Sequence, residues 1–308
     1  MGAKRVLVAS PRGFCAGVCR AVDTVEAALR EYTPPIYCFH EIVHNRQVVD
    51  SLAAKGIVFV DDLDAVPDGG VLLFSAHGVA PALRDAVRQR GLHVVDATCP
   101  FVSKVHVEVK RYAENGYTIL LIGKRGHDEV VGVAGEAPDQ LIVIENEREA
   151  REVTVPDPEC VAVVMQTTLS YAEAGSVLTV LRERFPSLVT PAHRDICYAT
   201  TNRQDAVRQL ALSCELVLVL GARNSANSNR LVEVARAAGT EALLVPYISA
   251  FAEIDLKLIE TVGVTAGAST PESFVDEVLL ELERLRFARV DLPAVAQEDI
   301  TLPPVSLP

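Results

Sequence analysis

Short apolar runs alternate with helical segments along most of this chain, and this alternation constrains the fold more tightly than any other feature. The runs are rich in valine, isoleucine and leucine, as the buried strands of parallel sheets are. They cover residues 5–9, 71–75, 118–123, 141–145, 161–165, 216–221 and 242–246. The segments 19–32, 201–214 and 228–239 repeat apolar residues with helical spacing, and the last of them stops at Gly239. The pattern predicts an α/β fold built on parallel sheets.

A cysteine stands at three of the predicted strand-to-helix turns. These are Cys15 in PRGFCAGVCRAV, Cys99 in VVDATCPFVSKV and Cys197 in HRDICYATTNRQ. A strand-like run ends 24 residues after each of them, at Phe39, Gly123 and Gly221. A cysteine followed at one fixed distance by the end of a strand indicates an internal repeat.

Polar residues follow two strands in each repeat. The first set of strand ends carries His44, His127 and Ser225, and the second set carries His77, Thr167 and Ser269. Ligands of open parallel sheets bind beyond the carboxyl ends of the strands. We therefore expect three similar small parallel-sheet α/β domains in a pseudo-threefold arrangement around one central site. The expected domains are residues 1–97, 98–195 and 196–285, followed by a proline-rich tail, 286–308, that is extended or disordered.

Three converging cysteines can form two kinds of metal site. A zinc site would need a fourth ligand, which a histidine could supply. Alternatively, three thiolates can hold a [4Fe–4S] cluster and leave one iron without a protein ligand. The cysteines are 84 and 98 residues apart, which resembles no zinc finger and favours the cluster, although spacing alone leaves both sites open.

The polar strand ends point to a small anionic ligand. Their side chains are hydrogen-bond donors or can become so, namely His44, His77, His127, Thr167, Ser225, Asn227 and Ser269. Several stand where a helix begins, and helix N-termini favour phosphate groups. Neither a Walker A loop nor a G-x-G-x-x-G turn after a strand is present, so a nucleotide is not indicated. The ligand we expect is a small anion-bearing molecule, of which a diphosphate is one example, beside a metal centre, with Glu129 as the carboxylic acid for proton transfer.

Composition excludes several other classes of protein. The net charge of −12, without a basic block, argues against a nucleic-acid partner. No apolar run approaches the ~18 residues that a membrane span requires, and the N-terminal segment lacks the pattern of a signal peptide. We therefore expect a cytoplasmic enzyme of 308 residues, with no membrane partner, whose cysteines are mostly reduced.

The remaining cysteines are interpreted as structural. Cys38, Cys160 and Cys214 are expected to be small buried side chains, as cysteines beside strands usually are. Cys19 lies one helical turn from Cys15, and we expect it to be buried on the face of that helix.

The motifs taken together resemble a known family. PRGFCAGV, HEIVHN, FSAHGV, DATCP, GKRGHDEV, QTTLS, CYATTNRQ, NSNRL and GVTAGAST occur in the order typical of the 4-hydroxy-3-methylbut-2-enyl diphosphate reductase family, of the LytB/IspH type. The resemblance extends from about residue 5 to residue 285 and leaves out the proline-rich tail. Two positions depart from the family pattern: Cys19 replaces a common aspartate, and Ala226 replaces a common serine.

The resemblance implies a reaction and a role for each residue. The reaction is the reductive removal of the allylic 4-hydroxyl of the diphosphate substrate, giving isopentenyl and dimethylallyl diphosphates in the last step of the non-mevalonate isoprenoid pathway. The cofactor would be a [4Fe–4S] cluster with one iron open to substrate, bound by Cys15, Cys99 and Cys197. The catalytic residues would be His127, Glu129 and Thr167. The substrate would be bound by His44, His77, His127, Thr167, Thr168, Ser225, Asn227 and Ser269.

Electrons would come one at a time from a carrier such as a ferredoxin or a flavodoxin, which suits a cluster better than a hydride donor. Two other classes of function compete with the reductase. One is a non-enzymatic iron–sulfur redox sensor, which would need a partner-binding surface in place of a diphosphate pocket. The other is a phosphosugar-type α/β transferase in which the cysteines have no role.

Overall fold

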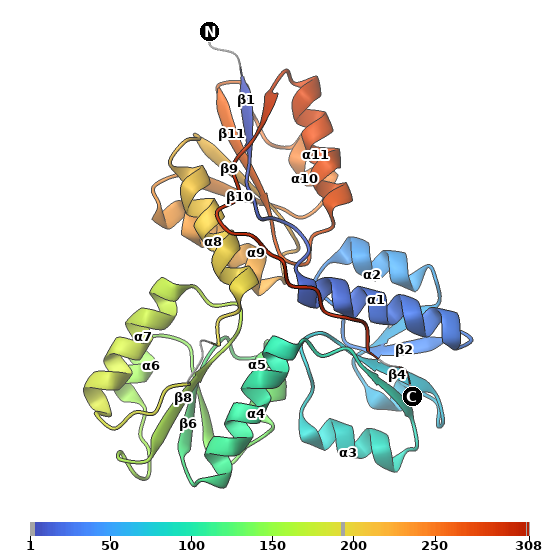
Figure 1. Ribbon diagram of the computed structural model, residues 1–308, viewed down its shortest axis with the longest axis vertical. Helices are drawn as coiled ribbons and strands as arrows, with labels where there is room; N and C mark the ends of the chain where they lie inside the picture. Colours follow the sequence, from blue (N-terminus) through green and yellow to red (C-terminus); the bar gives the residue numbers. More distant parts are fainter. Residues whose placement is uncertain (1–3, 192–194, 306, 308) are drawn as a thin grey trace. The chain divides into compact units, whose positions relative to one another are not determined.

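The computed structural model describes residues 4–191, 195–305 and 307, and within them the chain forms three separate β-sheets (Figure 1). Every strand pair in this part of the chain is parallel. The expected α/β class with three small parallel sheets is therefore confirmed.

The largest sheet has five strands in the order β10–β9–β11–β1–β12. Its strands are β1 (Arg5–Val8), β9 (Leu216–Leu220), β10 (Glu241–Val245), β11 (Thr261–Ala266) and β12 (Ala288–Asp291). The four-stranded sheet, in the order β3–β2–β4–β5, is formed by β2 (Ile36–Phe39), β3 (Ile57–Val60), β4 (Val71–Phe74) and β5 (His93–Asp96). The three-stranded sheet, in the order β7–β6–β8, is formed by β6 (Thr118–Ile122), β7 (Leu141–Ile144) and β8 (Val161–Met165).

Helices follow most strands, as the alternating pattern predicts. They are α1 (Ala16–Glu31), α2 (Arg46–Ala53), a short 3₁₀ helix η1 (Leu63–Ala65), α3 (Pro81–Gln89), α4 (Pro100–Glu114), α5 (Asp128–Ala134), α6 (Glu147–Glu152), α7 (Tyr171–Arg184), α8 (Tyr198–Ala211), α9 (Ala226–Ala237), α10 (Ile248–Ala252) and α11 (Glu272–Arg284).

Buried apolar side chains lie on both faces of two of the sheets. In the five-stranded sheet, α10 and α11 pack on one face through residues such as Phe251 and Phe274, and α8 and α9 pack on the other through Val207 and Leu231. In the three-stranded sheet, α6 and α7 cover one face and α4 and α5 the other. This coverage explains why the central strands read as continuous apolar runs rather than as an alternating pattern.

Two segments lie differently from the sequence prediction. The strand Arg5–Val8, which was assigned to the domain 1–97, pairs with β11 and β12 in the five-stranded sheet. The tail expected over 286–308 contains the strand β12, and residues 292–305 after it form neither helix nor strand. The two differences have different causes. An apolar run predicts a strand but does not identify the neighbour with which it pairs, and β12, with the exposed sequence ARVD, is too polar to be recognised as a strand. The boundaries at residues 97, 195 and 285 stay a prediction.

The chain divides into two compact units. The first consists of residues 1–18, 44–48 and 198–301 and holds the five-stranded sheet. The second consists of residues 19–43, 49–197 and 302–308 and holds the two smaller sheets. In the described residues, the helices are all too short or too polar to cross a lipid bilayer.

Candidate active site

Each of the three predicted cluster ligands directly precedes a helix. Cys15, Cys99 and Cys197 stand immediately before α1, α4 and α8, and all three side chains are half-buried. The backbone N–H of each cysteine donates a hydrogen bond across to a turn that follows another strand. The acceptors are the carbonyl oxygens of Ala268, Ala76 and Thr167, at 3.2, 3.0 and 3.1 Å respectively.

These acceptors occupy the same position in three equivalent turns. The turns are 75–78, 166–169 and 267–270, and in each the fourth N–H donates to the first carbonyl, at 3.2, 3.5 and 2.9 Å. The second residue of each turn accepts the cysteine N–H, and the third residue is His77, Thr168 or Ser269. The internal repeat predicted from the sequence therefore exists as a repeated hydrogen-bond pattern that sets a cysteine beside a predicted substrate-binding residue.

Two further predicted residues cap helices. His127 is the N-cap of α5, and its Nδ1 accepts a hydrogen bond from the Glu129 N–H at 3.2 Å. Because Nδ1 is an acceptor in this bond, a neutral His127 ring carries its proton on Nε2. Ser225 is the N-cap of α9, and its Oγ accepts from the N–H and the hydroxyl of Ser228 at 3.3 and 3.0 Å. Both helices therefore begin at a residue predicted to bind the diphosphate.

Glu129 is a buried acid of the second unit, with 2% of its surface exposed. Its Oε1 accepts from the Thr167 N–H at 2.7 Å, and its Oε2 accepts from the Thr167 hydroxyl at 2.9 Å. Thr167 in turn accepts the Cys197 N–H on its own carbonyl oxygen. One residue thus connects the predicted proton donor to the backbone of a predicted cluster ligand.

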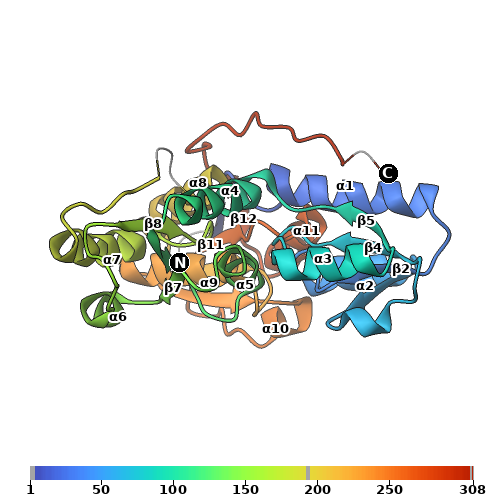
Figure 2. The ribbon, with the colours of Figure 1, turned by 90° about the horizontal axis from the view of Figure 1, so that it is seen from below.

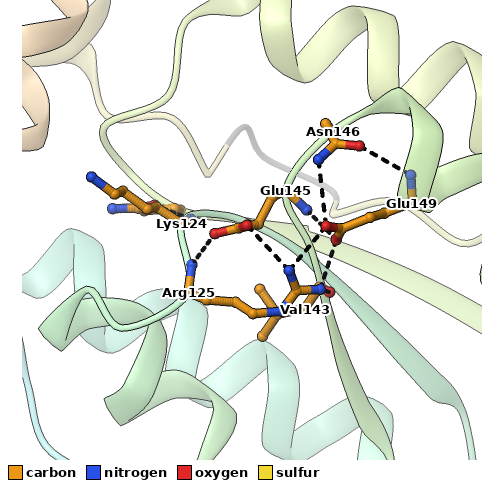
Figure 3. Close-up of polar contacts among 7 residues, drawn as sticks. Lys124, Arg125, Val143, Glu145, Asn146 and Glu149 are labelled. Atoms are coloured by element: carbon orange, nitrogen blue, oxygen red, sulfur yellow. Dashed lines mark hydrogen bonds and ion pairs between the residues drawn. The ribbon is translucent and has the colours of Figure 1, made fainter.

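The loop before His127 is held by a cluster of charges (Figure 3). Arg125 contacts Glu145 Oε2 at 3.1 Å and Glu149 at 3.0 and 2.6 Å, and donates to the Val143 carbonyl at 2.7 Å. The hydrogen bonds from Arg125 lower the pKa of Glu149 to about 2. The Glu149 carboxylate therefore stays ionised at neutral pH, and this network fixes the Lys124–Gly126 turn at the end of β6.

In the first unit, His44 and Ser269 are in contact. The Ser269 hydroxyl donates to the His44 carbonyl oxygen at 2.9 Å, and Asn224 Nδ2 lies 3.4 Å from His44 Nδ1. The two contacts join the loop before α2 to the turn after β11, through Ser269, and to the turn after β9, through Asn224.

Asn227, in the first turn of α9, is a predicted substrate-binding residue of the first unit whose side chain is buried. It is 5% exposed, and neither its Nδ2 nor its Oδ1 has a hydrogen-bond partner among residues 4–191, 195–305 and 307. A buried polar group without a partner costs roughly 1–3 kcal/mol. The amide is therefore available to form hydrogen bonds with a ligand.

Sequence reasoning missed a carboxylate beside the histidines of the second unit. Asp128, the first residue of α5, lies 2.9 Å from His40 Nδ1 and 3.9 Å from His77 Nδ1. The hydrogen bond to Asp128 raises the pKa of His40 above its usual value. The signal that could have found Asp128 is its position, because it directly follows His127 in the sequence.

The other four cysteines were expected to be buried, and only Cys38 is. Cys38 is fully buried, and burial raises the pKa of its thiol far above the usual value. Cys160 and Cys214 are half-buried. Cys19 is exposed, which corrects the expectation that it is buried: on α1 the residues turned inward are Val18, Ala21 and Val25, and Cys19 lies off that face.

The predicted site residues are distributed over both units. The first unit contains Cys15, His44, Ser225, Asn227 and Ser269, and the second contains His77, Cys99, His127, Glu129, Thr167, Thr168 and Cys197. Tyr198, beside Cys197 in sequence, stays protonated, because burial and then the neighbouring Cys15 raise the pKa of its phenol to about 12. The first unit offers one half-buried thiol with imidazole, hydroxyl and amide groups, and the second offers two half-buried thiols, the buried Glu129 carboxyl group and further imidazole and hydroxyl groups. Groups of these kinds suit the binding of a soft metal centre and of an anionic substrate.

Comparison with known proteins agrees with this chemistry. Residues 6–283 match the family described as LytB protein. A 4-hydroxy-3-methylbut-2-enyl diphosphate reductase of Mycobacterium sp. (strain KMS) is 52% identical over 96% of this chain and 90% of its own length. A second reductase of that name, from Mycobacterium tuberculosis (strain ATCC 25618 / H37Rv), is 51% identical over 96% of this chain and 89% of its own length.

A solved structure extends the likeness to three dimensions. The E-1-hydroxy-2-methyl-but-2-enyl-4-diphosphate reductase of Plasmodium falciparum aligns over 100% of this chain and 96% of its own, with a TM-score of 0.93 and 35% identity. Sequence motifs, sheet topology and relatives of nearly full length lead to one conclusion, that the chain belongs to the LytB family of 4-hydroxy-3-methylbut-2-enyl diphosphate reductases.

Proposed function

We propose that this chain reduces (E)-4-hydroxy-3-methylbut-2-enyl diphosphate to isopentenyl and dimethylallyl diphosphates. The observation that carries the proposal is the Glu129–Thr167–Cys197 chain of hydrogen bonds, which ties a buried acid to a cysteine at a strand-to-helix turn. Family membership supports the same reaction, since relatives half identical to this chain carry that name. The reaction consumes two electrons and two protons per substrate and releases water.

Cys15, Cys99 and Cys197 are the proposed ligands of a [4Fe–4S] cluster with one open iron. All three thiols are half-buried and begin a helix, and three equivalent backbone hydrogen bonds hold them, so the donor set fits such a cluster. When bound, the cluster supplies single electrons and a Lewis-acidic iron for the substrate hydroxyl.

Glu129 is the proposed proton donor to the departing oxygen. Hydroxide is a poor leaving group, and protonation by a positioned carboxylic acid converts it into water. The two bonds from Thr167 fix the orientation of the carboxyl group, so that little reorganisation is needed during reaction. The allylic fragment that remains can be protonated at either end, which accounts for two products.

The diphosphate is the anchor of the substrate. Its proposed donors are the side chains of His44, His77, His127, Thr167, Thr168, Ser225, Asn227 and Ser269. The unsatisfied Asn227 amide supports this role, because a phosphate oxygen would accept from its Nδ2. Binding energy from this anchor positions the reacting carbon. The proposed electron donor is a one-electron carrier, a ferredoxin or a flavodoxin.

Anaerobic purification tests this proposal. We expect a brown protein with about four irons, an electron-paramagnetic-resonance signal that changes when the diphosphate substrate is added, and turnover with a one-electron reductant. Cys99→Ser should lose both iron and turnover, while Cys160→Ser should keep both. A colourless protein that carries zinc would contradict the proposal, and a clustered protein that never reduces the diphosphate would favour the redox sensor.

A further inference from the structure

The C-terminal segment 292–305 lies outside the family match, which ends at residue 283, and the proposed reaction gives it no role. Figure 2 shows it as an extended segment without helix after β12. We define residues 292–305 as the strap. Its first part runs along the loop that leads to Cys15, since the Leu292 N–H donates to the Val8 carbonyl at 2.9 Å and the Val295 N–H to the Ser10 carbonyl at 3.1 Å.

Glu298 of the strap neutralises a fully buried arginine. Arg203, on α8, is 0% exposed, and its Nη1 and Nη2 lie 2.9 and 3.3 Å from the two carboxylate oxygens of Glu298. Asn202 Nδ2 also donates to Glu298, at 3.1 Å. A buried guanidinium needs a counter-charge, because an uncompensated buried charge is strongly destabilising.

The same guanidinium holds the backbone that carries Cys15. Arg203 Nε and Nη2 donate to the Gly13 carbonyl at 3.1 and 2.7 Å, and Nη2 lies 3.4 Å from the carbonyl of Phe14, the residue before Cys15. Gly13 has a φ of +66°, and a Cβ there would lie 3.2 Å from the Thr270 carbonyl oxygen. The turn is therefore tightly enclosed, and the arginine fixes its two carbonyl groups.

The far end of the strap makes a second contact of the same kind in the second unit. Arg20 Nη1 donates to the carbonyl of Thr98, the residue before Cys99, at 2.8 Å. Its Nε donates to the strap carbonyl of Pro303 at 3.2 Å, and the Val305 N–H donates to Thr24 Oγ1 at 3.2 Å. An arginine thus contacts the carbonyl before each of two cysteines, and the strap supplies an acceptor to each arginine.

We propose that the strap is a positioning element for the proposed cluster ligands, acting through Glu298 and Arg203 on the Cys15 turn and through Pro303 and Arg20 on the Cys99 turn. The inference rests on the proposed function only in naming these cysteines as ligands. Because the strap acts through Arg203 and Arg20, its expected effect is on the rigidity of the two turns and on how long they retain iron.

Hydrogen exchange of the full-length protein, followed by mass spectrometry, tests the two contacts separately. Glu298→Gln should speed exchange of segment 10–15, which includes the bonded amides of Gly13 and Cys15, by about tenfold or more and leave segment 96–99 unchanged. Removal of residues 302–308 should do the reverse. Asp291→Asn is the matched control, since Asp291 pairs with Arg289 in an exposed salt bridge nearby and should alter neither segment.

Iron release to a chelator from the anaerobically purified protein is the second readout, and we expect it to be several times faster for Glu298→Gln. Unchanged exchange of segment 10–15, or equal acceleration of all segments, would overturn the proposal. If Glu298→Gln does not fold, Glu298→Asp, which keeps the charge and shortens the side chain, is measured against the same criteria. The exchange readout needs neither cluster nor turnover, so a failure of the proposed reductase leaves this test intact.

Discussion

Glu129 and Glu108 are two buried carboxyl groups of the second unit with very different surroundings. Glu129 receives two hydrogen bonds from Thr167, and these fix its orientation. Glu108, on α4, is 8% exposed and lies near the buried Asp195, with Lys104 bonded to Asp195 at 3.0 Å and 3.7 Å from Glu108. Burial, and then Asp195, raise the pKa of Glu108 to about 7. Of these two residues, only Glu129 was expected from the sequence, because a motif marks it.

Glu129→Gln should lower turnover by about 100-fold or more, because an amide keeps the shape of the carboxyl group but provides no acidic proton. Iron content and the resonance signal of the reduced protein should not change. Steady-state reduction of the diphosphate with excess reductant measures the first quantity. Glu147→Gln, on the exposed face of α6, is the control and should keep full activity. A Glu129→Gln enzyme with normal turnover would remove this residue from the mechanism.

Glu108→Gln should stabilise the protein at alkaline pH. The pKa of Glu108 is higher in the folded than in the unfolded chain, so its contribution to stability is fully present below about pH 4 and is lost as the pH rises through about 7. At pH 8 we expect the variant to be more stable by about 2 kcal/mol, and at pH 4 the difference should vanish. Urea unfolding at both pH values measures this, with Glu114→Gln on the exposed side of α4 as the control.

At the scale of elements, α9 packs unusually closely on two strand ends. A Cβ at Gly221, after β9, would lie 2.1 Å from Ser228 Oγ and 2.6 Å from Ser228 Cβ, and one at Gly267, after β11, would lie 2.1 Å from the same Oγ. Ser228 also donates to the N-cap Ser225. The position of the helix start that carries Ser225 and Asn227 therefore depends on two glycines.

Gly221→Ala should force α9 away from the sheet and cost about 1–3 kcal/mol, the usual range for overpacking. The KM for the diphosphate should rise because Ser225 and Asn227 move with the helix. Thermal unfolding and substrate titration measure the two effects. Gly175→Ala is the matched control: nothing lies within 4 Å of its Cβ, and as a position inside α7 it should gain about 0.5–1 kcal/mol.

The strands, turns and side-chain contacts differ in how well the sequence predicts them. The strands over 118–123, 161–165 and 216–221 were predictable because strands covered by helices on both faces must be apolar throughout. The turns after them were predictable because polar residues recur there at similar distances along the chain after Cys15, Cys99 and Cys197. Contacts made by single polar side chains, such as Arg203 with Glu298 or His40 with Asp128, leave no periodic signal and were not predictable.

At the scale of the whole chain, the first strand completes the sheet formed by the last third of the sequence. β1 lies between β11 and β12, and β12 is exposed along its whole length. This edge strand carries the Arg289–Asp291 ion pair, and charges on an edge strand discourage pairing with another molecule. The sequence predicted the strand at 5–9, but neither its pairing nor the strand β12, since parallel partners can come from any distance along the chain and ARVD is not an apolar run.

Removal of residues 288–308 should lower the free energy of unfolding by about 2–4 kcal/mol, because β1 loses its ladder to β12 and Arg203 loses its counter-charge. Chemical denaturation followed by circular dichroism measures this. Removal of residues 302–308 alone should have a smaller effect on global stability. Equal losses from the two truncations would show that β12 contributes little to the five-stranded sheet.

The place of β1 in the sheet also determines when the protein can mature during synthesis. A ribosome makes Cys15 and its turn first, but the carbonyl groups of Ala266 and Ala268 that hold this turn, and Glu298 beyond them, are made last. The two smaller sheets need only residues made earlier, so they can fold while translation continues. The thiol of Cys15 stays on an unfolded segment until nearly the whole chain has emerged, and loading of the proposed cluster is therefore expected to be a post-translational event.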